Sequence, residues 1–109
     1  MELVFYQSSS GRSPVVKFID DQPKRDQAVL LAVLSEVEEM GLQAKGAVFR
    51  QIEGKLWEIK IKTPSGGYRI MYVLISAKTM MLLHAFKKKT QKTPLNELAI
   101  ARKRLTEVL

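Results

Sequence analysis

Positively charged side chains recur on three neighbouring strand-like runs of this sequence and at their ends. Lys60 lies within the first run, Arg69 near the start of the second, and Lys87, Lys88 and Lys89 follow the third. Arg presents a planar fork of donors to phosphate oxygens and Lys a point charge, so both suit a charged phosphoryl transition state. One chemistry that such residues allow without a metal is attack of an RNA 2′-hydroxyl on the adjacent phosphate, while another group takes its proton.

Acidic and metal-ligating residues do not form a comparable group. A Mg²⁺-dependent nuclease needs clustered carboxylates, and only Glu53 and Glu58 lie near these runs. The single histidine, His84, and the absence of cysteine argue against a protein zinc site. Gly66 and Gly67 indicate a turn, because no helix follows them as it would in a phosphate-binding loop. We therefore expect neither a metal nor another cofactor.

The charge of the chain is unevenly distributed. Residues 1–49 contain five Lys and Arg and seven acids, a net −2, whereas residues 50–109 contain 13 Lys and Arg and four acids, a net +9. This asymmetry predicts a polyanionic partner that faces the C-terminal half. The alternative is a basic surface that only keeps the protein soluble.

The cations are positioned by a predicted three-stranded meander. Its strands are expected at residues 56–62, 68–75 and 80–86, and the turns between them are short enough to join antiparallel neighbours. In the first strand, Lys60 shares one face with Leu56, Glu58 and Lys62, and the other face carries Trp57, Ile59 and Ile61. Such alternation fits a sheet with one face on a core and one face open to a ligand.

The remaining elements complete a single α+β domain over residues 1–109. We expect a strand at residues 2–6, a helix that begins at Ser13-Pro14, and a second helix from Pro23 to about Met40. Residues 43–51 are predicted to be a loop, and Thr93-Pro94 to start a last helix. The order β-α-α-β-β-β-α predicts a mostly antiparallel four-stranded sheet flanked by helices.

The second helix is apolar around much of its circumference, because residues 28–34 are apolar without a break. Burial between the sheet and the first helix would explain this run. The alternative is that part of it contacts a partner protein.

Targeting and membrane signals are absent from the sequence. The N-terminus lacks the pattern of a signal peptide, and no apolar run approaches the ~18 residues of a membrane span. We expect a cytoplasmic protein with no membrane partner, which the lack of cysteine suits.

Several longer segments resemble the RelE/ParE toxin superfamily, and within it most closely the HigB branch related to phage host-inhibition proteins. They are GKLWEIKIK, GYRIMYVL and LLHAFKKKTQKTP, with SGRSPVVKFIDDQP and NELAIARKRL in agreement. The resemblance spans nearly the whole chain. It implies a RelE-like fold, a toxin of a type II toxin–antitoxin pair, ribosome-dependent cleavage of mRNA without a metal, and a cognate antitoxin with a helix-turn-helix domain.

The resemblance also implies roles for individual residues. The phosphate-stabilising Arg of the family matches Arg69, one strand-borne basic residue matches Lys60, and a second falls on Glu58. A basic residue after the last strand matches Lys87 or Lys88. The candidate catalytic residues are thus Lys60, Arg69, His84 and Lys88, and the candidate RNA-binding residues are Glu58, Tyr68, Lys87, Lys89 and Lys92.

The general base remains open. The C-terminal Tyr that RelE-like members use has no counterpart here, which leaves Glu58, His84 and a Lys with a depressed pKa as candidates.

Most candidates have a structural alternative. Arg69 could form an ion pair with Glu58, because a mid-strand cation is costly to bury unpaired. His84 alternates with Leu82 and Phe86 and could be a hydrogen-bonded histidine of the core or edge. Tyr68 could stack on a base or pack in the core. Lys60 and the lysines that follow the third strand could simply face solvent.

Two other functions compete with mRNA cleavage. The same scaffold could be a ParE-like, non-enzymatic inhibitor of DNA gyrase, and a general RNA-binding module without cleavage is a third reading. Retention of Arg69 and of the HAFKKK run favours the endoribonuclease.

Overall fold

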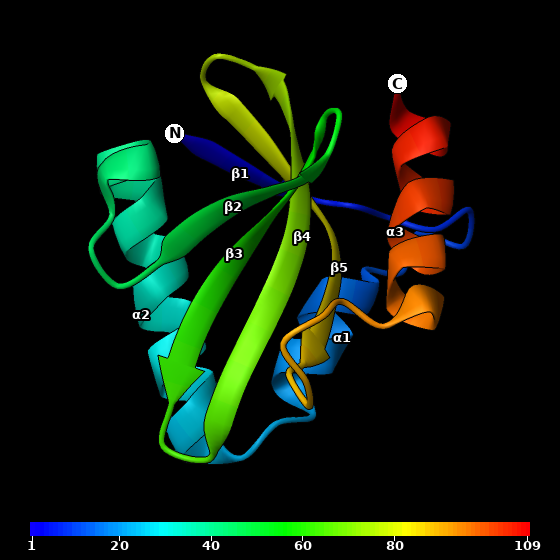
Figure 1. Ribbon diagram of the computed structural model, residues 1–109. Helices are drawn as coiled ribbons and strands as arrows, with labels where there is room; N and C mark the ends of the chain where they lie inside the picture. Colours follow the sequence, from blue (N-terminus) through cyan, green and yellow to red (C-terminus); the bar gives the residue numbers. More distant parts are fainter.

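The predicted meander forms the middle of a five-stranded sheet in the computed structural model, which describes residues 1–109 (Figure 1). The order of strands across the sheet is β1-β5-β4-β3-β2. β1 pairs with β5 in parallel, and all other neighbours are antiparallel. The elements are β1 (Glu2–Phe5), α1 (Pro14–Asp20), α2 (Lys24–Met40), a 3₁₀ turn (Gly41–Gln43), β2 (Val48–Glu53), β3 (Leu56–Thr63), β4 (Gly66–Ser76), β5 (Thr79–Lys87) and α3 (Leu95–Val108).

The α+β class and the meander β3–β4–β5 are confirmed, but the four-stranded sheet was wrong, and the loop predicted at residues 43–51 is confirmed only for residues 44–47. Val48–Glu53 is a strand, β2, that pairs antiparallel with β3 at the edge of the sheet. The turn between them contains Gly54 with a φ of 51°, a conformation that favours glycine. Arg50, Gln51 and Glu53 interrupt the apolar residues of β2, and charge is typical of an edge strand that must not pair further. Its hydrophobic signal is weak for that reason.

Local signals placed the helices correctly. Ser13 caps α1 by accepting a hydrogen bond from the Val16 N–H at 3.4 Å, and Pro14 occupies the first turn. α2 ends at Met40, and Gly41 follows it with a φ of 59°. α3 begins at Leu95, one residue later than the proline signal suggested, with Pro94 at the N-cap position.

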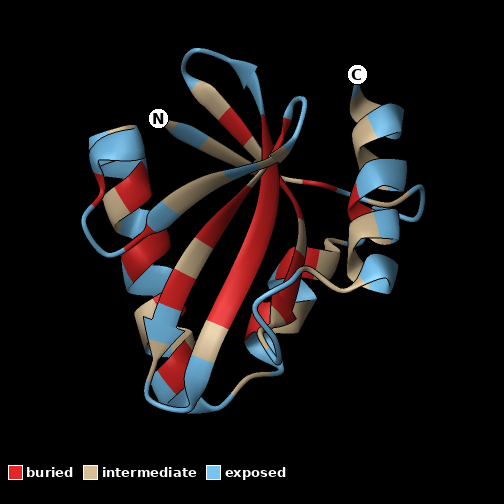
Figure 2. Cartoon of the chain, in the orientation of Figure 1, coloured by how far each residue is buried: buried red, intermediate tan, exposed pale blue.

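The two faces of the sheet are covered differently (Figures 1 and 2). α1 and α2 cover the first face and form the larger core, in which Val15, Leu30 and Val37 are buried with Ile59 and Ile70. α3 packs on the second face, where its apolar residues meet a smaller core. That core contains Tyr6, Leu56, Met71, Val73, Leu83, Phe86 and Ala101. α3 meets only part of the second face.

The apolar run of α2 is half buried. Leu30, Val33 and Leu34 lie in the core, which confirms the explanation by burial for these positions. Leu31 is 54% exposed on the other side of the helix. The exposed side of α2 that contains Leu31 remains the predicted contact surface for a partner protein. No helix of the structure combines the length and the apolar character that crossing a membrane requires.

Candidate functional site

The second face of the sheet contains a cationic pocket beyond the reach of α3. Its volume is about 760 Å³, and the ends of β3 and β5 and the starts of β2 and β4 surround it. Twelve residues line it, and none of them is acidic. Its cations are Lys45, Lys60, Lys62, Arg69 and Lys88. A concave site with one sign of charge concentrates anions, so this pocket is the candidate functional site.

Strand register brings two predicted site residues together. Lys60 on β3 lies directly opposite Arg69 on β4, and Val48 on β2 lies opposite Lys60 from the other side. Directly opposite residues project from the same face of a sheet, at Cβ separations of about 5 Å. Val48 is 60% exposed and is the apolar part of this otherwise charged row.

A β-bulge on β5 determines whether Lys87 or Lys88 lies on the same face of the sheet as Lys60 and Arg69. Met71 pairs with His84 but its neighbour Tyr72 pairs with Leu82, so Leu83 is an extra residue. Because of this extra residue, His84 and Phe86 lie on the opposite face of the sheet from Leu82. Simple alternation had predicted one face for all three.

Lys88 consequently lines the pocket, and Lys87 does not. The backbone N–H of Lys88 donates to the Gly67 carbonyl at 2.8 Å. A side chain at Gly67 would place its Cβ 3.4 Å from the Lys88 Cδ, so the glycine leaves room for Lys88 to lie across β4.

Arg69 forms the floor of the site and is fully buried. Its Nη2 donates to the backbone carbonyls of Gln91, at 2.7 Å, and Thr90, at 3.4 Å. Both carbonyls belong to residues 88–94, which link β5 to α3 and are called the strap below. The strap therefore covers one edge of the Arg69 guanidinium.

Glu58 lies beneath Arg69 and is also fully buried. Its Oε1 is 2.8 Å from Nη2 of Arg50 and 3.8 Å from Nε of Arg69. The ion pair proposed from the sequence as an alternative for Arg69 is thus present, with Arg50 as the nearer partner of Glu58. Sequence reasoning missed Arg50 because its strand was read as a loop.

The hydrogen bonding of this charge cluster is incomplete. Five buried side-chain nitrogen and oxygen atoms lack a hydrogen-bond partner, and all of them belong to Arg50, Glu58 and Arg69. They are Nε of Arg50, both carboxylate oxygens of Glu58, and Nε and Nη1 of Arg69. Buried polar groups are nearly always paired, so their concentration in one cluster marks it as exceptional.

Lys87 and Tyr68 lie on the opposite face of the sheet. Lys87 Nζ donates to the Ser65 hydroxyl at 2.9 Å and lies 5.7 Å from the centre of the Tyr68 ring. The Tyr68 hydroxyl donates to Asp26 of α2 at 2.7 Å, and its ring packs edge-on against Phe18. Tyr68 is one of the residues that line the pocket, but its ring and hydroxyl pack against α1 and α2 on the opposite side of the sheet from Lys60.

Asp26 joins α2 to the β3–β4 turn. Its carboxylate accepts hydrogen bonds from the hydroxyls of Ser65 and Tyr68. These bonds, the one from Ser65 above all, lower the pKa of Asp26, while burial acts in the opposite direction.

His84 lies under α3 rather than in the pocket. Its Nε2 is 2.8 Å from Oε1 of Glu97, and Nη1 of Arg104 is 3.2 Å from its Nδ1. Burial lowers the pKa of His84, an effect that Glu97 partly offsets. Both ring nitrogens are therefore engaged by side chains of α3.

The other predicted cations lie at the margin. Lys89 and Lys92 are exposed on the strap. Lys45 and Lys62, which sequence reasoning did not assign to the site, line the pocket. The alternation of β3 already placed Lys62 on the face of Lys60, so that signal was available. No group of three or more His, Asp and Glu side chains is arranged to hold a metal ion.

Comparison with known proteins gives one finding. The family model described as "Phage derived protein Gp49-like (DUF891)" matches residues 17–106. This range contains β2–β5, the strap and nearly all of α3. No curated protein matches the chain significantly.

Proposed function

The chain belongs to the Gp49-like family of phage-derived proteins, a RelE/HigB-like toxin family, and from this premise we propose that it is an endoribonuclease toxin. In this proposal it cuts mRNA on the ribosome, in the cytoplasm, and thereby stops translation and growth. It acts as the toxin of a type II toxin–antitoxin pair. A cognate helix-turn-helix antitoxin holds it inactive.

The observation that carries the proposal is the cationic pocket with Arg69 at its floor. Five cations and no acid line a hollow large enough for a nucleotide phosphate and its ribose. Nη1 of Arg69 is buried there without a partner, although a guanidinium N–H is a strong donor. A phosphate oxygen is the acceptor that best matches this donor and the surrounding ammonium groups.

The proposed chemistry is an internal displacement at phosphorus. The 2′-hydroxyl of a ribose gives up its proton and its oxygen attacks the adjacent phosphorus. The bond from phosphorus to the 5′-oxygen breaks, and that oxygen takes up a proton, so that a cyclic phosphate and a 5′-hydroxyl result. Lys60, Arg69 and Lys88 stabilise the negative charge that develops on the phosphate oxygens. No metal takes part in this mechanism.

The ribosome supplies the alignment. Glu58 is buried against two arginines, and both nitrogens of His84 are engaged, so either candidate base must leave its partners before it takes a proton. Positioning of the 2′-hydroxyl in line with the leaving oxygen can then provide much of the acceleration. This requirement explains why the proposal places cleavage on translated mRNA.

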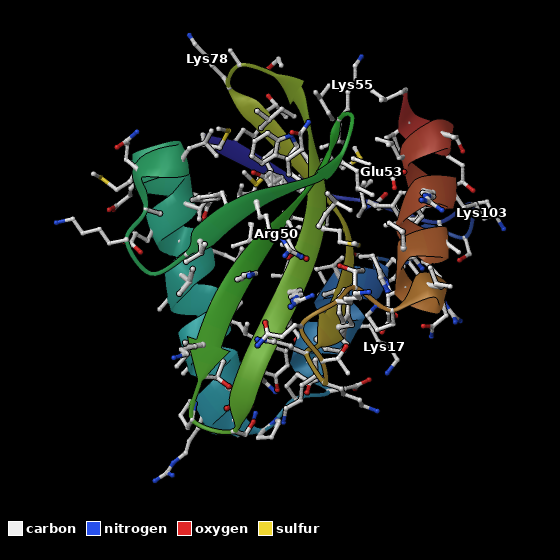
Figure 3. The ribbon with its side chains drawn as sticks, in the orientation of Figure 1. Lys17, Arg50, Glu53, Lys55, Lys78 and Lys103 are labelled. Carbon is white, nitrogen blue, oxygen red and sulfur yellow. The ribbon has the colours of Figure 1, made fainter.

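The experiment is brief induction of the protein in growing cells, followed by mapping of mRNA 5′ ends. We expect new 5′ ends within coding regions. In a reporter mRNA, these ends should disappear when its start codon is removed and it is no longer translated. Lys60→Ala should slow cleavage on the order of 10²-fold. Lys78→Ala, at the exposed turn between β4 and β5 (Figure 3), should not.

Three results would contradict the proposal. Efficient cutting of naked RNA by the purified protein would remove the role of the ribosome. Loss of cleavage in EDTA would show that a metal is needed. Intact mRNA together with a loss of DNA supercoiling would favour a ParE-like inhibitor of gyrase.

A further inference from the structure

Arg50 and Arg69 share a single carboxylate. Two guanidinium groups contact Glu58, so this buried cluster carries a net charge of +1. Nε of Arg50, like Nε and Nη1 of Arg69, is a donor without a hydrogen bond. Buried or half-buried donors of this kind gain most when a further anion approaches.

Arg50 is the member of the cluster that solvent can reach. Its side chain is 42% exposed, whereas those of Glu58 and Arg69 are buried. In Figure 3 it extends from β2 over the middle of the second face of the sheet. Its Nη2 lies 2.8 Å from Oε1 of Glu58, while its Nε has no hydrogen-bond partner, so the guanidinium has donor capacity left for a ligand.

The position of Arg50 continues the pocket along the strands. Arg50 follows Val48 by two residues on β2, and Glu58, opposite Arg50, precedes Lys60 by two residues on β3. A two-residue step along a strand is about 6.8 Å, and both residues of each pair project from the same face. The cationic surface of the pocket thus extends by one such step toward α3.

We propose that Arg50 binds a second phosphate of the RNA strand, next to the phosphate that the lysine pocket holds. The inference rests on the proposed function and extends its substrate contacts. The RNA runs over the second face of the sheet where β2 and β3 pair, from Lys62 and Lys60 toward Arg50. The exposed side chain of Val48 contacts the ribose or base between the two phosphates.

Glu58 acts as a positioning residue in this arrangement. Its Oε1 attracts Nη2 of Arg50 across 2.8 Å, as an ion pair without hydrogen-bond geometry, and so keeps the guanidinium close to this part of the sheet. An arginine held in this way loses less conformational entropy when it binds phosphate than a free surface arginine does.

The test measures binding separately from cleavage. The probe is a single-stranded RNA with methylated 2′-hydroxyls, which cannot attack the phosphate, and fluorescence anisotropy follows its binding between 50 and 200 mM salt. Arg50→Gln removes the charge but leaves a polar side chain next to Glu58. One lost phosphate contact should reduce the slope of log affinity against log salt by ~0.7. The loss of affinity should then be about 2.6-fold larger at 50 mM than at 200 mM salt.

Arg102→Gln is the matched control. Arg102 on α3 is 53% exposed and forms an ion pair with Glu53, so the same change removes the same charge from an arginine of similar exposure. We expect its salt slope to equal that of the wild type. Arg50→Lys, which restores the charge, should recover the slope.

The outcomes separate this inference from the proposed function. If the wild type binds RNA and Lys60→Gln lowers the slope while Arg50→Gln behaves as Arg102→Gln, the role of Arg50 is refuted and the function stands. If the wild type neither binds RNA nor cuts translated mRNA, the proposed function fails.

Should Arg50→Gln not fold, Arg50→Gln/Glu58→Gln is compared with Glu58→Gln alone, because neither contains an unpaired buried carboxylate. The same difference in slope is then expected between these two proteins. Equal slopes would refute the role of Arg50.

Discussion

The surroundings of Arg69 predict that its positive charge stabilises the fold and that its planar guanidinium is needed for cleavage. Its side chain is 1% exposed and lies 3.8 Å from the buried carboxylate of Glu58. Two unit charges at that distance attract each other by about 4 kcal/mol at an effective dielectric constant of about 20. Removal of one partner from a buried pair costs about 3–5 kcal/mol, against a total stability of about 5–15 kcal/mol. Because Arg50 remains beside Glu58, Arg69→Met should fall at the lower end of that range.

Arg69→Lys should behave differently. Lysine keeps a positive charge near Glu58 but loses the planar fork that reaches both Gln91 and the pocket. We expect a loss of about 1.5–3 kcal/mol in stability, the value of a hydrogen bond to a charged group. Cleavage should slow on the order of 10²–10³-fold, because the transition state loses a fixed donor.

Urea denaturation and cleavage of translated mRNA measure the two effects on the same preparations. The double variant Glu58→Gln/Arg69→Met supplies the critical comparison, since it contains no carboxylate that has lost a partner. It should be more stable than Arg69→Met and equally inactive. An Arg69→Met protein as stable as the wild type would refute the ion-pair argument. A folded Arg69→Lys protein with full toxicity would remove Arg69 from the chemistry.

Three further predictions concern acid stability and the partner protein. Because the bond from Ser65 lowers the pKa of Asp26 below 3.8, its stabilising effect is complete above that value and is lost as pH falls through the lowered pKa. Asp26→Asn should therefore flatten the acid limb of unfolding curves, and unchanged curves would contradict the Ser65–Asp26 bond. Burial lowers the pKa of His84 below 6.5, so its unfolded form takes up protons first and stability declines as pH falls below 6.5. His84→Gln should remove that decline in thermal melts, and its persistence would assign it to other groups. For the antitoxin, titration calorimetry should show weaker binding after Leu31→Asp, whereas charge reversal at Lys60 and Lys88, which line the cationic pocket, weakens it only if the antitoxin covers that site. Unchanged affinity in both variants would exclude contact with either surface.

The sequence predicted those parts of the fold that local signals specify. Alternation in β3 reported a half-buried strand, and Ser13-Pro14 and Gly41 marked helix ends through backbone requirements that do not depend on the rest of the chain. β2 was missed because an edge strand carries charged residues in place of a continuous apolar pattern.

The site was predicted less completely, for two physical reasons. Arg50 belongs to β2, so missing that strand removed it from consideration. The side of the sheet on which Lys87 and Lys88 lie depends on the bulge at Leu83, which reverses alternation. The apolar sequence of β5 contains no local signal for the position of the bulge at Leu83. Register across the sheet, rather than any local pattern, places Lys88 with Lys60 and Arg69.

The buried position of Arg69 is compatible with a direct contact to RNA. The strap engages only Nη2, through the carbonyls of Thr90 and Gln91. Nη1 is the nitrogen that lacks a partner, and Arg69 lines the pocket beside Lys60. Because Nη1 is buried, a phosphate reaches it only after neighbouring side chains move aside, but neither bond from Nη2 to the strap has to break. In the proposed reaction, the two bonds to the strap would keep the guanidinium in place, as a preorganised donor requires.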